Sequence, residues 1–353
     1  MTNATLKTSL HALHHEYGAR CIDFASFELP AWFSSMKEEH LAVRHTVGMF
    51  DISHMGLFRI SGPSSRAFLQ SLSCNTTPSP SSSKMVYSMF LNENGMILDD
   101  VMFGCIDDTW HLVVNGANQH KIKGWLAHHA PDDMVIEHLN QSHSFIAVQG
   151  PDAEAACQSV VDIPLSTLNR FELTTTSFGN FPCVISRTGY TGEDGFEIMI
   201  AHDGAIELWS HLYKEGVTPC GLAARDTLRI EYGLPLYGQE LSESIHPHMT
   251  RYAWVVKNTH SFIGQEALVR HKDAVQVTSV GLQLSEPLIA RPNYLIEEGG
   301  YISSGTLSPH SGNSIALAFV PVDYASIGST VSVHIRKKLI SATVTDVPFS
   351  GIR

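Results

Sequence analysis

The sequence has no long hydrophobic run, no paired-cysteine motif and no cluster of basic residues. No stretch of eighteen consecutive apolar residues occurs, so no membrane span is expected. Lys and Arg number 23 against 35 Asp and Glu, and the formal net charge is −12. This balance argues against a general nucleic-acid binder, because neutralising phosphates needs clustered positive charge. Residues 1–17 contain neither arginine nor a long apolar core, so we expect neither a secretory signal nor a transit peptide.

The six cysteines are scattered and show no Cys-x-x-Cys spacing, which argues against a zinc ribbon and against a dithiol redox site. Reduced thiols of a cytoplasmic protein are the simpler interpretation. The chain has 20 histidines, but His14–His15, His128–His129 and His246–His248 lack the i, i+4 spacing of a helical metal site. We therefore expect no metal.

Length and patterning predict more than one domain. With 353 residues and 43% hydrophobic content, the chain can form two or three substantial cores. A helix is expected over residues 6–17, ending at Gly18, and helices and strands then follow in mixed order. From Thr278 onward, segments with period-two alternation predict a separate antiparallel β domain. These segments are 280–284, 301–304, 315–320, 330–336 and 340–347.

A hairpin is predicted over residues 85–103, where two apolar runs flank Asn94-Gly95. Asn-Gly favours the two-residue type I′ turn, because both central residues of that turn need positive φ. Such a turn would place four residues on one face: Tyr87, Met89, Asp100 and Met102. This face would offer a carboxylate, a phenol and two thioethers to a flat, partly polar heterocycle. The alternative is that Asp99 and Asp100 form an edge pair facing water.

A glycine-rich segment, Arg187 to Glu197, lies between two predicted strands. It contains three glycines, two threonine hydroxyls, three acidic residues and Tyr190. It is not a phosphate loop, because no Gly-Lys-Ser or Gly-Lys-Thr ends it and its acidic residues would repel phosphate. We expect it to present carboxylates to a ligand that carries N–H donors. The alternative is a hairpin with a purely structural role.

Two arginines share one face of the helix predicted after Pro219. Arg225 and Arg229 are four residues apart, which places them on neighbouring turns. We expect one of them to pair internally with Asp226 or Glu231. The other is expected to reach a ligand carboxylate, which the guanidinium fork fits well.

With these residues in view, the sequence from about Gly18 to Phe349 resembles the aminomethyltransferase (T-protein) family of the glycine cleavage system. The order and spacing of several short motifs carry the resemblance. They are Gly18-Ala-Arg, Glu38 to Arg44, Phe50 to Gly56, Leu98-Asp-Asp100, Arg187 to Glu197, Gly221 to Arg229, Leu236 to Glu240, Phe262-Ile-Gly264 and Ser304 to Pro309.

The resemblance implies an α+β fold of three domains arranged in a ring. The first domain would be discontinuous (residues 1–50 and 144–250). It would receive an inserted antiparallel α+β second domain, residues 51–143, that carries the Asp100 hairpin. Residues 251–353 would form a C-terminal antiparallel β domain of barrel or jelly-roll type.

The resemblance also implies the activity and the site. The methylene carbon of aminomethyl-dihydrolipoyl H-protein would pass to tetrahydrofolate, a co-substrate, with release of ammonia. Asp100 would be the catalytic carboxylate. The implied folate-binding residues are Met55, Tyr87, Asp100, Met102, Tyr190, Glu197 and Arg225. The partners would be lipoylated H-protein and folate, without nucleic acid, membrane or metal.

Gly104 departs from the family pattern, because a ligand-contacting tyrosine is common at this position. We expect a missing pocket wall there, so that aminomethyl transfer persists with a raised folate requirement and Gly104→Tyr recovers part of the affinity. A folate-binding relative of the iron–sulfur maintenance type is disfavoured, because its Lys-Gly-Cys-Tyr-x-Gly-Gln-Glu signature is replaced here by Arg187 to Glu197. The alternative function is a catalytically reduced folate-binding paralogue that acts as a binding or regulatory module.

Overall fold

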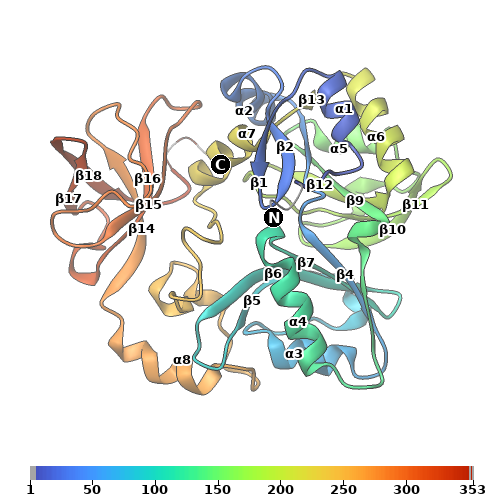
Figure 1. Ribbon diagram of the computed structural model, residues 1–353, viewed down its shortest axis with the longest axis horizontal. Helices are drawn as coiled ribbons and strands as arrows, with labels where there is room; N and C mark the ends of the chain where they lie inside the picture. Colours follow the sequence, from blue (N-terminus) through green and yellow to red (C-terminus); the bar gives the residue numbers. More distant parts are fainter. Residues whose placement is uncertain (1–4, 350, 352–353) are drawn as a thin grey trace. The chain divides into compact units, whose positions relative to one another are not determined.

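The computed structural model describes residues 5–349 and 351, and it contains mixed helices and strands in separate sheets (Figure 1). This confirms the predicted α+β class. By internal contacts the chain divides into two compact units. The first unit comprises Met1–Leu69, Thr77–Tyr87 and Val101–Arg225, and the second comprises Gln70–Thr76, Ser88–Asp100 and Asp226–Arg353. The three predicted domain boundaries stay a prediction.

A six-stranded sheet forms the centre of the first unit. Its strand order is β10-β11-β12-β9-β3-β13, with every pair antiparallel except the short β13–β3 pair. The strands are β3 (Gly48–Asp51), β9 (His143–Gln149), β10 (Leu173–Phe178), β11 (Phe181–Ser186), β12 (Gly195–Ala201) and β13 (Thr218–Pro219). The predicted pattern of strand, glycine-rich loop and strand over 181–200 is confirmed by β11 and β12.

Helices α5 (Ala153–Gln158) and α6 (His202–Lys214) pack on this sheet beside β9 and β12 (Figure 1). Their apolar residues, including Cys157, Leu208 and Trp209, form one buried cluster with Ile146 of β9 and Ile198 of β12. Successive strand residues point to opposite faces, so one face of β12 contributes to this core and the other remains available for a site.

A five-stranded sheet has the order β5-β6-β7-β4-β8. Its strands are β4 (Gly56–Ser61), β5 (Met85–Leu91), β6 (Ile97–Ile106), β7 (Thr109–Val114) and β8 (Val135–His138). All five lie in sequence between β3 and β9. Helices α3 (Ser65–Leu72) and α4 (Gln119–His129) belong to the same stretch of chain. Two more helices, α2 (Met36–His45) and α7 (Leu222–Tyr232), flank the six-stranded sheet in sequence.

The hairpin turn between β5 and β6 differs from its prediction. The Asn92 N–H donates to the Met96 carbonyl at 2.9 Å, so three residues rather than two form the loop. Gly95 alone has positive φ there, at 76°, as expected for a type I turn followed by a left-handed residue. The type I′ prediction is therefore wrong. Continued outward without interruption, this ladder places Met89 opposite Asp99 instead of Asp100.

The type I′ conformation occurs one turn later. Asp107 and Asp108 both have positive φ, 49° and 57°, and they join β6 to β7 between the paired residues Ile106 and Thr109. Aspartate tolerates the left-handed region because its side chain can satisfy nearby backbone groups, so Asp-Asp here does what Asn-Gly was expected to do.

The C-terminal part is an antiparallel sheet with the order β15-β16-β14-β18-β17. Its strands are β14 (Val277–Leu284), β15 (Tyr301–Leu307), β16 (Ser314–Pro321), β17 (Thr330–Ile335) and β18 (Lys338–Thr345). Alternate residues form its core, among them Leu282, Ala318 and Val333. The prediction of an antiparallel β domain is confirmed. Helix α8 (Gln265–His271) precedes it.

The N-terminal helix α1 (His11–Glu16) is shorter than the predicted 6–17. Leu6 instead bridges to Phe27 of β2 (Phe27–Trp32), accepting the Glu28 N–H at 2.9 Å. Strand β1 (Arg20–Phe24) pairs with β2 as a separate two-stranded sheet. A tertiary backbone pairing therefore displaced the first turn of the predicted helix, while Gly18, at φ 80°, follows the helix end as predicted.

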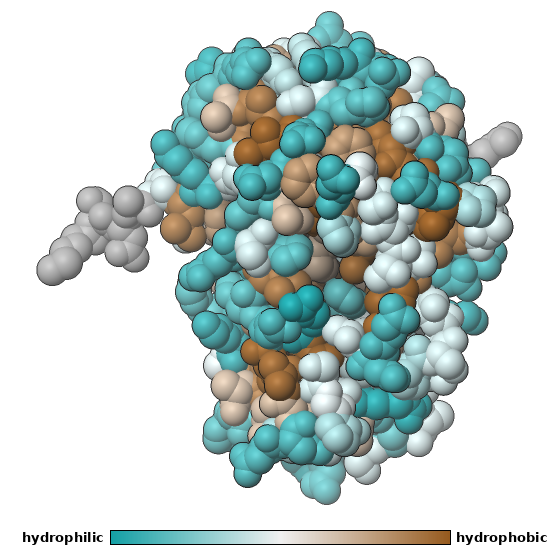
Figure 2. Space-filling view, turned by 90° about the vertical axis from the view of Figure 1, so that its right-hand side faces the viewer, coloured by the Kyte–Doolittle hydropathy of each residue, from teal (hydrophilic) through white to brown (hydrophobic). Residues whose placement is uncertain are grey.

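Polar residues cover most of the face shown in Figure 2, and apolar residues form separate small areas on it. Across residues 5–349 and 351, no helix combines the length and the apolar character that crossing a membrane requires.

Gly104 is packed against neighbouring chain and faces no open wall. A Cβ added there would lie 2.8 Å from the Lys84 carbonyl oxygen and 3.0 Å from side-chain atoms of Leu173 and Met85. The expectation that Gly104→Tyr restores a pocket wall is therefore wrong, because even a methyl group must displace backbone.

We predict that Gly104→Ala lowers the free energy of unfolding by about 1–3 kcal/mol, the usual cost of overpacking. The matched control is Gly124→Ala in α4, where an added Cβ meets no heavy atom within 4 Å. It should raise the unfolding free energy by about 0.4–1 kcal/mol, because alanine favours the helix. Urea unfolding measures both. Similar effects of the two substitutions would contradict the packing assigned to Gly104.

Candidate functional site

The glycine-rich loop of residues 187–194 is held by a fully buried glutamine at the end of β9. The Gln149 side chain donates from Nε2 to the Thr188 carbonyl at 3.0 Å and accepts from the Thr191 hydroxyl at 2.9 Å. A Cβ at Gly189 would lie 1.8 Å from Gln149 Oε1, so this close approach requires glycine. The loop backbone is thus fixed from inside the sheet.

Arg187 neutralises one acidic residue of the loop. Its guanidinium donates to both oxygens of Asp194, to Glu154 of α5 at 2.8 Å and to the Leu168 carbonyl at 3.0 Å. The plane also lies over the Phe196 ring, 5.2 Å from its centroid. The hydrogen bond from Arg187 lowers the pKa of the Asp194 carboxyl. Asp194 is therefore a structural carboxylate.

Arg44 neutralises a second acidic residue. It projects from the last turn of α2, with 3% of its side chain exposed, and its Nη1 lies 2.8 Å from Glu193 Oε1. The same nitrogen donates to the Thr191 carbonyl at 2.8 Å. Ser35 is the N-cap of helix α2, and its hydroxyl accepts the Glu38 N–H, so a capped helix places this arginine.

Glu197 of β12 is the third acidic residue, and it has no arginine hydrogen bond. Its Oε2 accepts from the Thr188 hydroxyl at 2.5 Å, and Thr188 is linked to Ser186 at 2.7 Å. Among the described residues, the Glu197 carboxylate takes part in no other side-chain hydrogen bond. Burial raises the pKa of Glu197, while the Thr188 hydrogen bond and the charge of Arg225 oppose that rise. A partly exposed carboxylate thus retains hydrogen-bonding capacity.

Arg225 lies near Glu197 and covers Tyr190. Its guanidinium carbon is 4.7 Å from the centroid of the Tyr190 ring. Burial lowers the pKa of Arg225, and the charges of Glu197 and Tyr190 act in the opposite direction. Its buried Nη1 donates no hydrogen bond to any residue in the described part of the chain. The three residues together present an acceptor, a donor and an aromatic ring.

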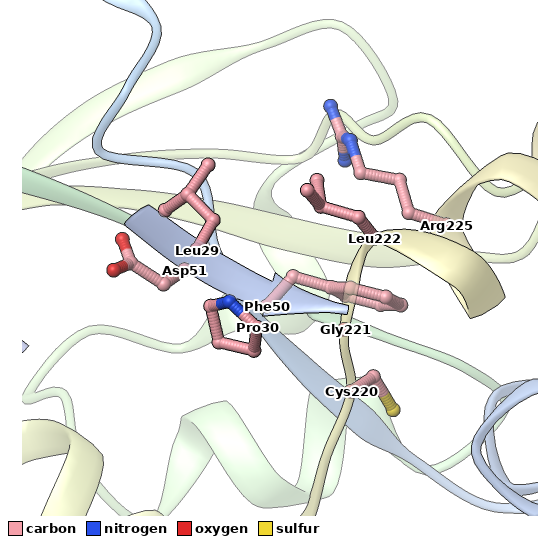
Figure 3. Close-up of a pocket in the computed structure, with 8 residues that line it drawn as sticks. All are labelled: Leu29, Pro30, Phe50, Asp51, Cys220, Gly221, Leu222 and Arg225. Carbon is pink, nitrogen blue, oxygen red and sulfur yellow. The ribbon is translucent and has the colours of Figure 1, made fainter. Parts of the chain in front are cut away.

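The start of α7 is tied to α2, which explains where Arg225 stands. The buried Glu39 carboxylate of α2 accepts the Gly221 N–H at 2.8 Å and the Phe33 and Ser34 N–H groups at 2.6 and 2.9 Å. In Figure 3, Leu222 and Arg225 extend from the first turn of α7, while Cys220 points to the other side. The cavity at this turn measures about 10 Å³, room for a single water and far too small for a pteridine.

His54 is a further buried group near Arg225. Burial, and then the positive charge of Arg225, lower the pKa of His54 to about 4, so the imidazole is neutral at pH 7. Its Nδ1 has no hydrogen-bond partner among the residues that the structure describes. It follows Asp51, a fully buried carboxylate that accepts from Thr8 at 2.6 Å and from the Ser53 N–H at 2.9 Å.

All seven residues implied for the site are partly exposed, so each can meet a ligand. Tyr190, Glu197 and Arg225 are brought together. Met102 packs beside a cluster of Met85, Ile106 and Leu173. Met55 and Tyr87 belong to the first unit and Asp100 to the second. Their roles stay predictions.

Asp99 and Asp100 differ in environment. Asp99 is fully buried and Asp100 is partly exposed, so they are not an edge pair that faces water together. Within the second unit, burial raises the pKa of Tyr252, and the negative charges of Glu240 and Asp100 add to the rise. Asp100 therefore lies within electrostatic reach of Tyr252.

One of the two arginines was predicted to pair internally with Asp226 or Glu231, and Arg229 confirms this by pairing with Asp226. Arg229 pairs with Asp226 at 2.8 Å and with Glu240 at 2.9 Å, and it donates to the Ser304 hydroxyl at 2.7 Å. Glu231 instead accepts from the Ser308 hydroxyl. Arg229 is thus a structural residue of the second unit.

Sequence reasoning gave no role to Thr188 or His54. Thr188 is one of the two hydroxyls noted in the glycine-rich segment, and its spacing from Glu197 across the loop was the available signal. His54 lies in the motif Phe50 to Gly56. Sequence alone does not reveal its buried, orphaned nitrogen.

Comparison with known proteins agrees along the whole chain. Residues 10–260 match the family model described as GCVT N-terminal domain, and residues 278–350 match the glycine cleavage T-protein C-terminal barrel domain. An aminomethyltransferase from Chloroherpeton thalassium is 39% identical, over 97% of this chain and 98% of the relative. One from Synechococcus elongatus is 41% identical, over 99% of this chain and 97% of the relative.

A solved structure is also similar. It is the crystal structure of glycine cleavage system aminomethyltransferase T from Bartonella henselae, with a TM-score of 0.91 and 29% identity. The match covers 99% of each chain.

A raised pKa on Glu197 predicts a pH-dependent cost to stability. The folded protein holds this proton more tightly than the unfolded chain, so ionisation of Glu197 opposes folding. Stability should fall as pH rises from the ordinary glutamate pKa of about 4.3 through the raised value. Above the raised value, the free energy of unfolding of wild type should have fallen relative to that of Glu197→Gln. The expected loss is about 1.4 kcal/mol for each pKa unit by which folding raises the pKa of Glu197.

Urea unfolding of wild type and Glu197→Gln at a series of pH values measures this difference directly. The variant keeps the shape of the side chain but cannot ionise, so other titrating groups cancel in the comparison. A stability difference that stays constant across the window would contradict the raised pKa.

Proposed function

Because the chain belongs to the glycine cleavage T-protein family, we propose that it is a tetrahydrofolate-dependent aminomethyltransferase. Its donor is the aminomethyl group carried on the dihydrolipoyl arm of H-protein. Membership of the family supports the reaction class, since the matched models cover residues 10–260 and 278–350. The observation that carries the folate assignment is Glu197, a partly exposed carboxylate beside Arg225 and Tyr190.

The proposed reaction transfers one carbon without oxidation or reduction. The carbon–sulfur and carbon–nitrogen bonds of the aminomethyl group break, and the methylene carbon joins N5 and N10 of tetrahydrofolate. The two protons that leave these nitrogens end on the departing ammonia and on the freed thiol. Products are 5,10-methylenetetrahydrofolate, ammonia and dihydrolipoyl H-protein.

Glu197 fits the ring edge of a pterin, which carries an amino group and a ring N–H. Asp194 and Glu193 are each held by an arginine, so Glu197, at the start of β12, is the carboxylate of the glycine-rich segment that has no arginine hydrogen bond and can accept from new donors. Two N–H groups facing one carboxylate form a bidentate, charge-assisted contact. The buried Nη1 of Arg225 offers a donor, and the Tyr190 ring offers an apolar surface.

We assign Asp100 the catalytic role. As an anion it can orient the folate amines and stabilise the cationic, iminium-like carbon that forms as ammonia leaves. Its partial exposure suits contact with substrate, whereas Asp99 is fully buried. We assign Met55, Tyr87 and Met102 to the pteridine-binding set, with Tyr190, Glu197 and Arg225.

The competing function is a folate-binding paralogue without turnover. A turnover assay in the reverse direction, with H-protein carrying the reduced, dihydrolipoyl arm, ammonia and methylenetetrahydrofolate, separates the two. Tetrahydrofolate formation at a rate proportional to enzyme supports the transferase. Tight folate binding without turnover would replace this proposal with the binding module.

We predict that Asp100→Asn loses activity on the order of 100-fold or more while folding normally, because the anion is removed but the shape is kept. Asp99→Asn is the matched control, and it should retain more activity because its side chain is buried away from substrate. The assay above measures both, with circular dichroism as the folding check. Equal losses in the two variants would refute the assignment of Asp100.

We predict that Glu197→Gln weakens tetrahydrofolate binding by about 1–3 kcal/mol, because pterin donors lose their acceptor. Glu193→Gln is the control from the same loop. It breaks the ion pair with Arg44 and should leave folate affinity within about twofold, since that carboxylate is already engaged. Calorimetric titration with tetrahydrofolate measures both. Unchanged affinity in Glu197→Gln would return the loop to a structural role.

A further inference from the structure

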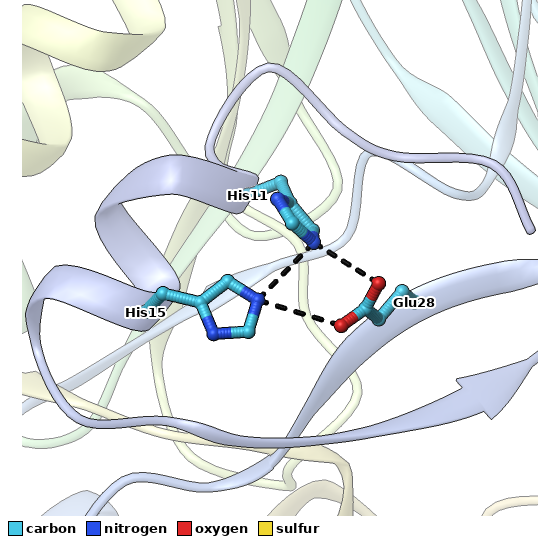
Figure 4. A group of neighbouring side chains, drawn as sticks. All are labelled: His11, His15 and Glu28. Carbon is cyan, nitrogen blue, oxygen red and sulfur yellow. Dashed lines mark hydrogen bonds and ion pairs between the residues drawn. The ribbon is translucent and has the colours of Figure 1, made fainter.

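Three potential metal ligands, none of them among the groups assigned above, converge at the N-terminal helix. His11 and His15 of α1 and Glu28 of β2 point toward one another, as Figure 4 shows. His11 Nε2 lies 3.1 Å from Glu28 Oε2, and His15 Nε2 lies 3.4 Å from Glu28 Oε1. The two Nε2 atoms are 3.2 Å apart. All of these atoms could therefore face one common centre.

The elements explain this convergence. His11 and His15 stand four residues apart on α1, so their side chains share one face of the helix. Glu28 projects from β2, and Asp23 of β1 pairs directly opposite it, which places a second carboxylate on the same face of the two-stranded sheet. The site is reachable, because 52% of the His15 side chain and 30% of the Glu28 side chain are exposed.

The spacing matches a coordination sphere. Ligand atoms about 2.05 Å from a tetrahedral zinc ion lie about 3.3 Å from one another. The two distances from Nε2 to a Glu28 oxygen are 3.1 and 3.4 Å, and the distance between the two Nε2 atoms is 3.2 Å. Little movement would be needed to take up an ion.

Hydrogen bonds alone do not satisfy the three contacts together. If both imidazoles carry a proton on Nε2, two donors face each other at 3.2 Å. If one lacks that proton, its lone pair faces the Glu28 carboxylate. A cation at the centre resolves the conflict, since two nitrogen lone pairs and a carboxylate all point toward it.

We propose that His11, His15 and Glu28 form a binding site for a divalent transition-metal ion of the zinc type. Imidazole nitrogen with a carboxylate suits zinc and its neighbours, whereas magnesium and calcium prefer oxygen alone. Three protein ligands leave a fourth position for water. The ion would link α1 to β2 through its ligands and so stabilise the N-terminal part of the first unit.

This pair of histidines does have the i, i+4 spacing that the other histidine groups lack. The adjacent pair His14–His15 lacks this spacing, whereas His11 and His15 have it. A short helix and a glutamate on a separate strand complete the set, and no spacing rule links Glu28 to the helix. The proposed site therefore differs from the expectation, drawn from the sequence, that the protein binds no metal.

Zinc binding to the chelator-stripped full-length protein tests it. Calorimetric titration with Zn²⁺ should show one equivalent that His15→Ala weakens at least about tenfold, since even outer-sphere losses cost about 10–100-fold. Glu28→Gln should do the same while keeping the side-chain shape. Co²⁺ bound in place of zinc should give the visible absorption of a four-coordinate site, absent in both variants. Circular dichroism checks that the variants fold.

The matched control is His334→Ala. His334 forms an exposed ion pair with Glu297 at 2.6 Å, a histidine–carboxylate pair taken from outside the cluster. It should leave the zinc equivalent unchanged. Zinc should also raise the thermal midpoint of wild type and of His334→Ala but not of His15→Ala. Absence of a zinc equivalent in wild type, or equal zinc binding by wild type and His15→Ala, would overturn the proposal. Neither readout depends on aminomethyl transfer, so its failure is separate from failure of the proposed function.

Discussion

Neutralisation of the glycine-rich loop by two arginines is the interaction on which the candidate site depends. Arg187 holds Asp194, and Arg44 holds Glu193. A loop with three acidic residues in a chain of net charge −12 would otherwise repel itself. Both arginines are largely buried and donate to backbone carbonyls as well, so they fix the path of the loop in addition to its charge.

This pairing gives the third acidic residue a different character. Glu197 accepts one hydroxyl hydrogen bond and lies in the field of Arg225, while burial raises its pKa. A carboxylate that keeps hydrogen-bonding capacity at a partly exposed position is suited to a ligand with paired N–H groups. Carboxylates of one segment can therefore have different roles. Those that pair with an arginine hold the backbone in place, and the one without such a pair can bind a ligand.

The same principle separates the two arginines of α7, of which Arg225 belongs to the first unit and Arg229 to the second. Arg229 is enclosed by Asp226, Glu240 and Ser304, whereas Arg225 faces an aromatic ring and keeps a buried, unpartnered nitrogen. The i, i+4 spacing indicated that both residues lie on one side of the helix. Which of them is structural depended on acids distant in sequence, since Glu240 is supplied by a later segment.

Much of the local structure could be predicted from sequence, because it depends on near neighbours. Period-two alternation was enough to predict the C-terminal antiparallel sheet, and the glycine-rich segment was correctly bounded by two strands. The hairpin at Asn94-Gly95 failed by one residue, because Asn92 closes a three-residue loop with its backbone and its side chain. A shift of one residue at the turn removes the basis on which the type I′ turn placed Tyr87, Met89, Asp100 and Met102 on one face, so that grouping stays a prediction.

The sequence by itself determined the fold class, the presence of the glycine-rich loop and the motifs that place the chain in its family. Only the tertiary structure decided how charges and space are shared. It showed that Gly104 lies against the Lys84 carbonyl, that Leu6 pairs with Phe27 instead of starting a helix, and that His11 and His15 meet Glu28. Turn chemistry and side-chain periodicity act over a few residues, whereas pairing, desolvation and close packing join residues that only the folded chain brings together.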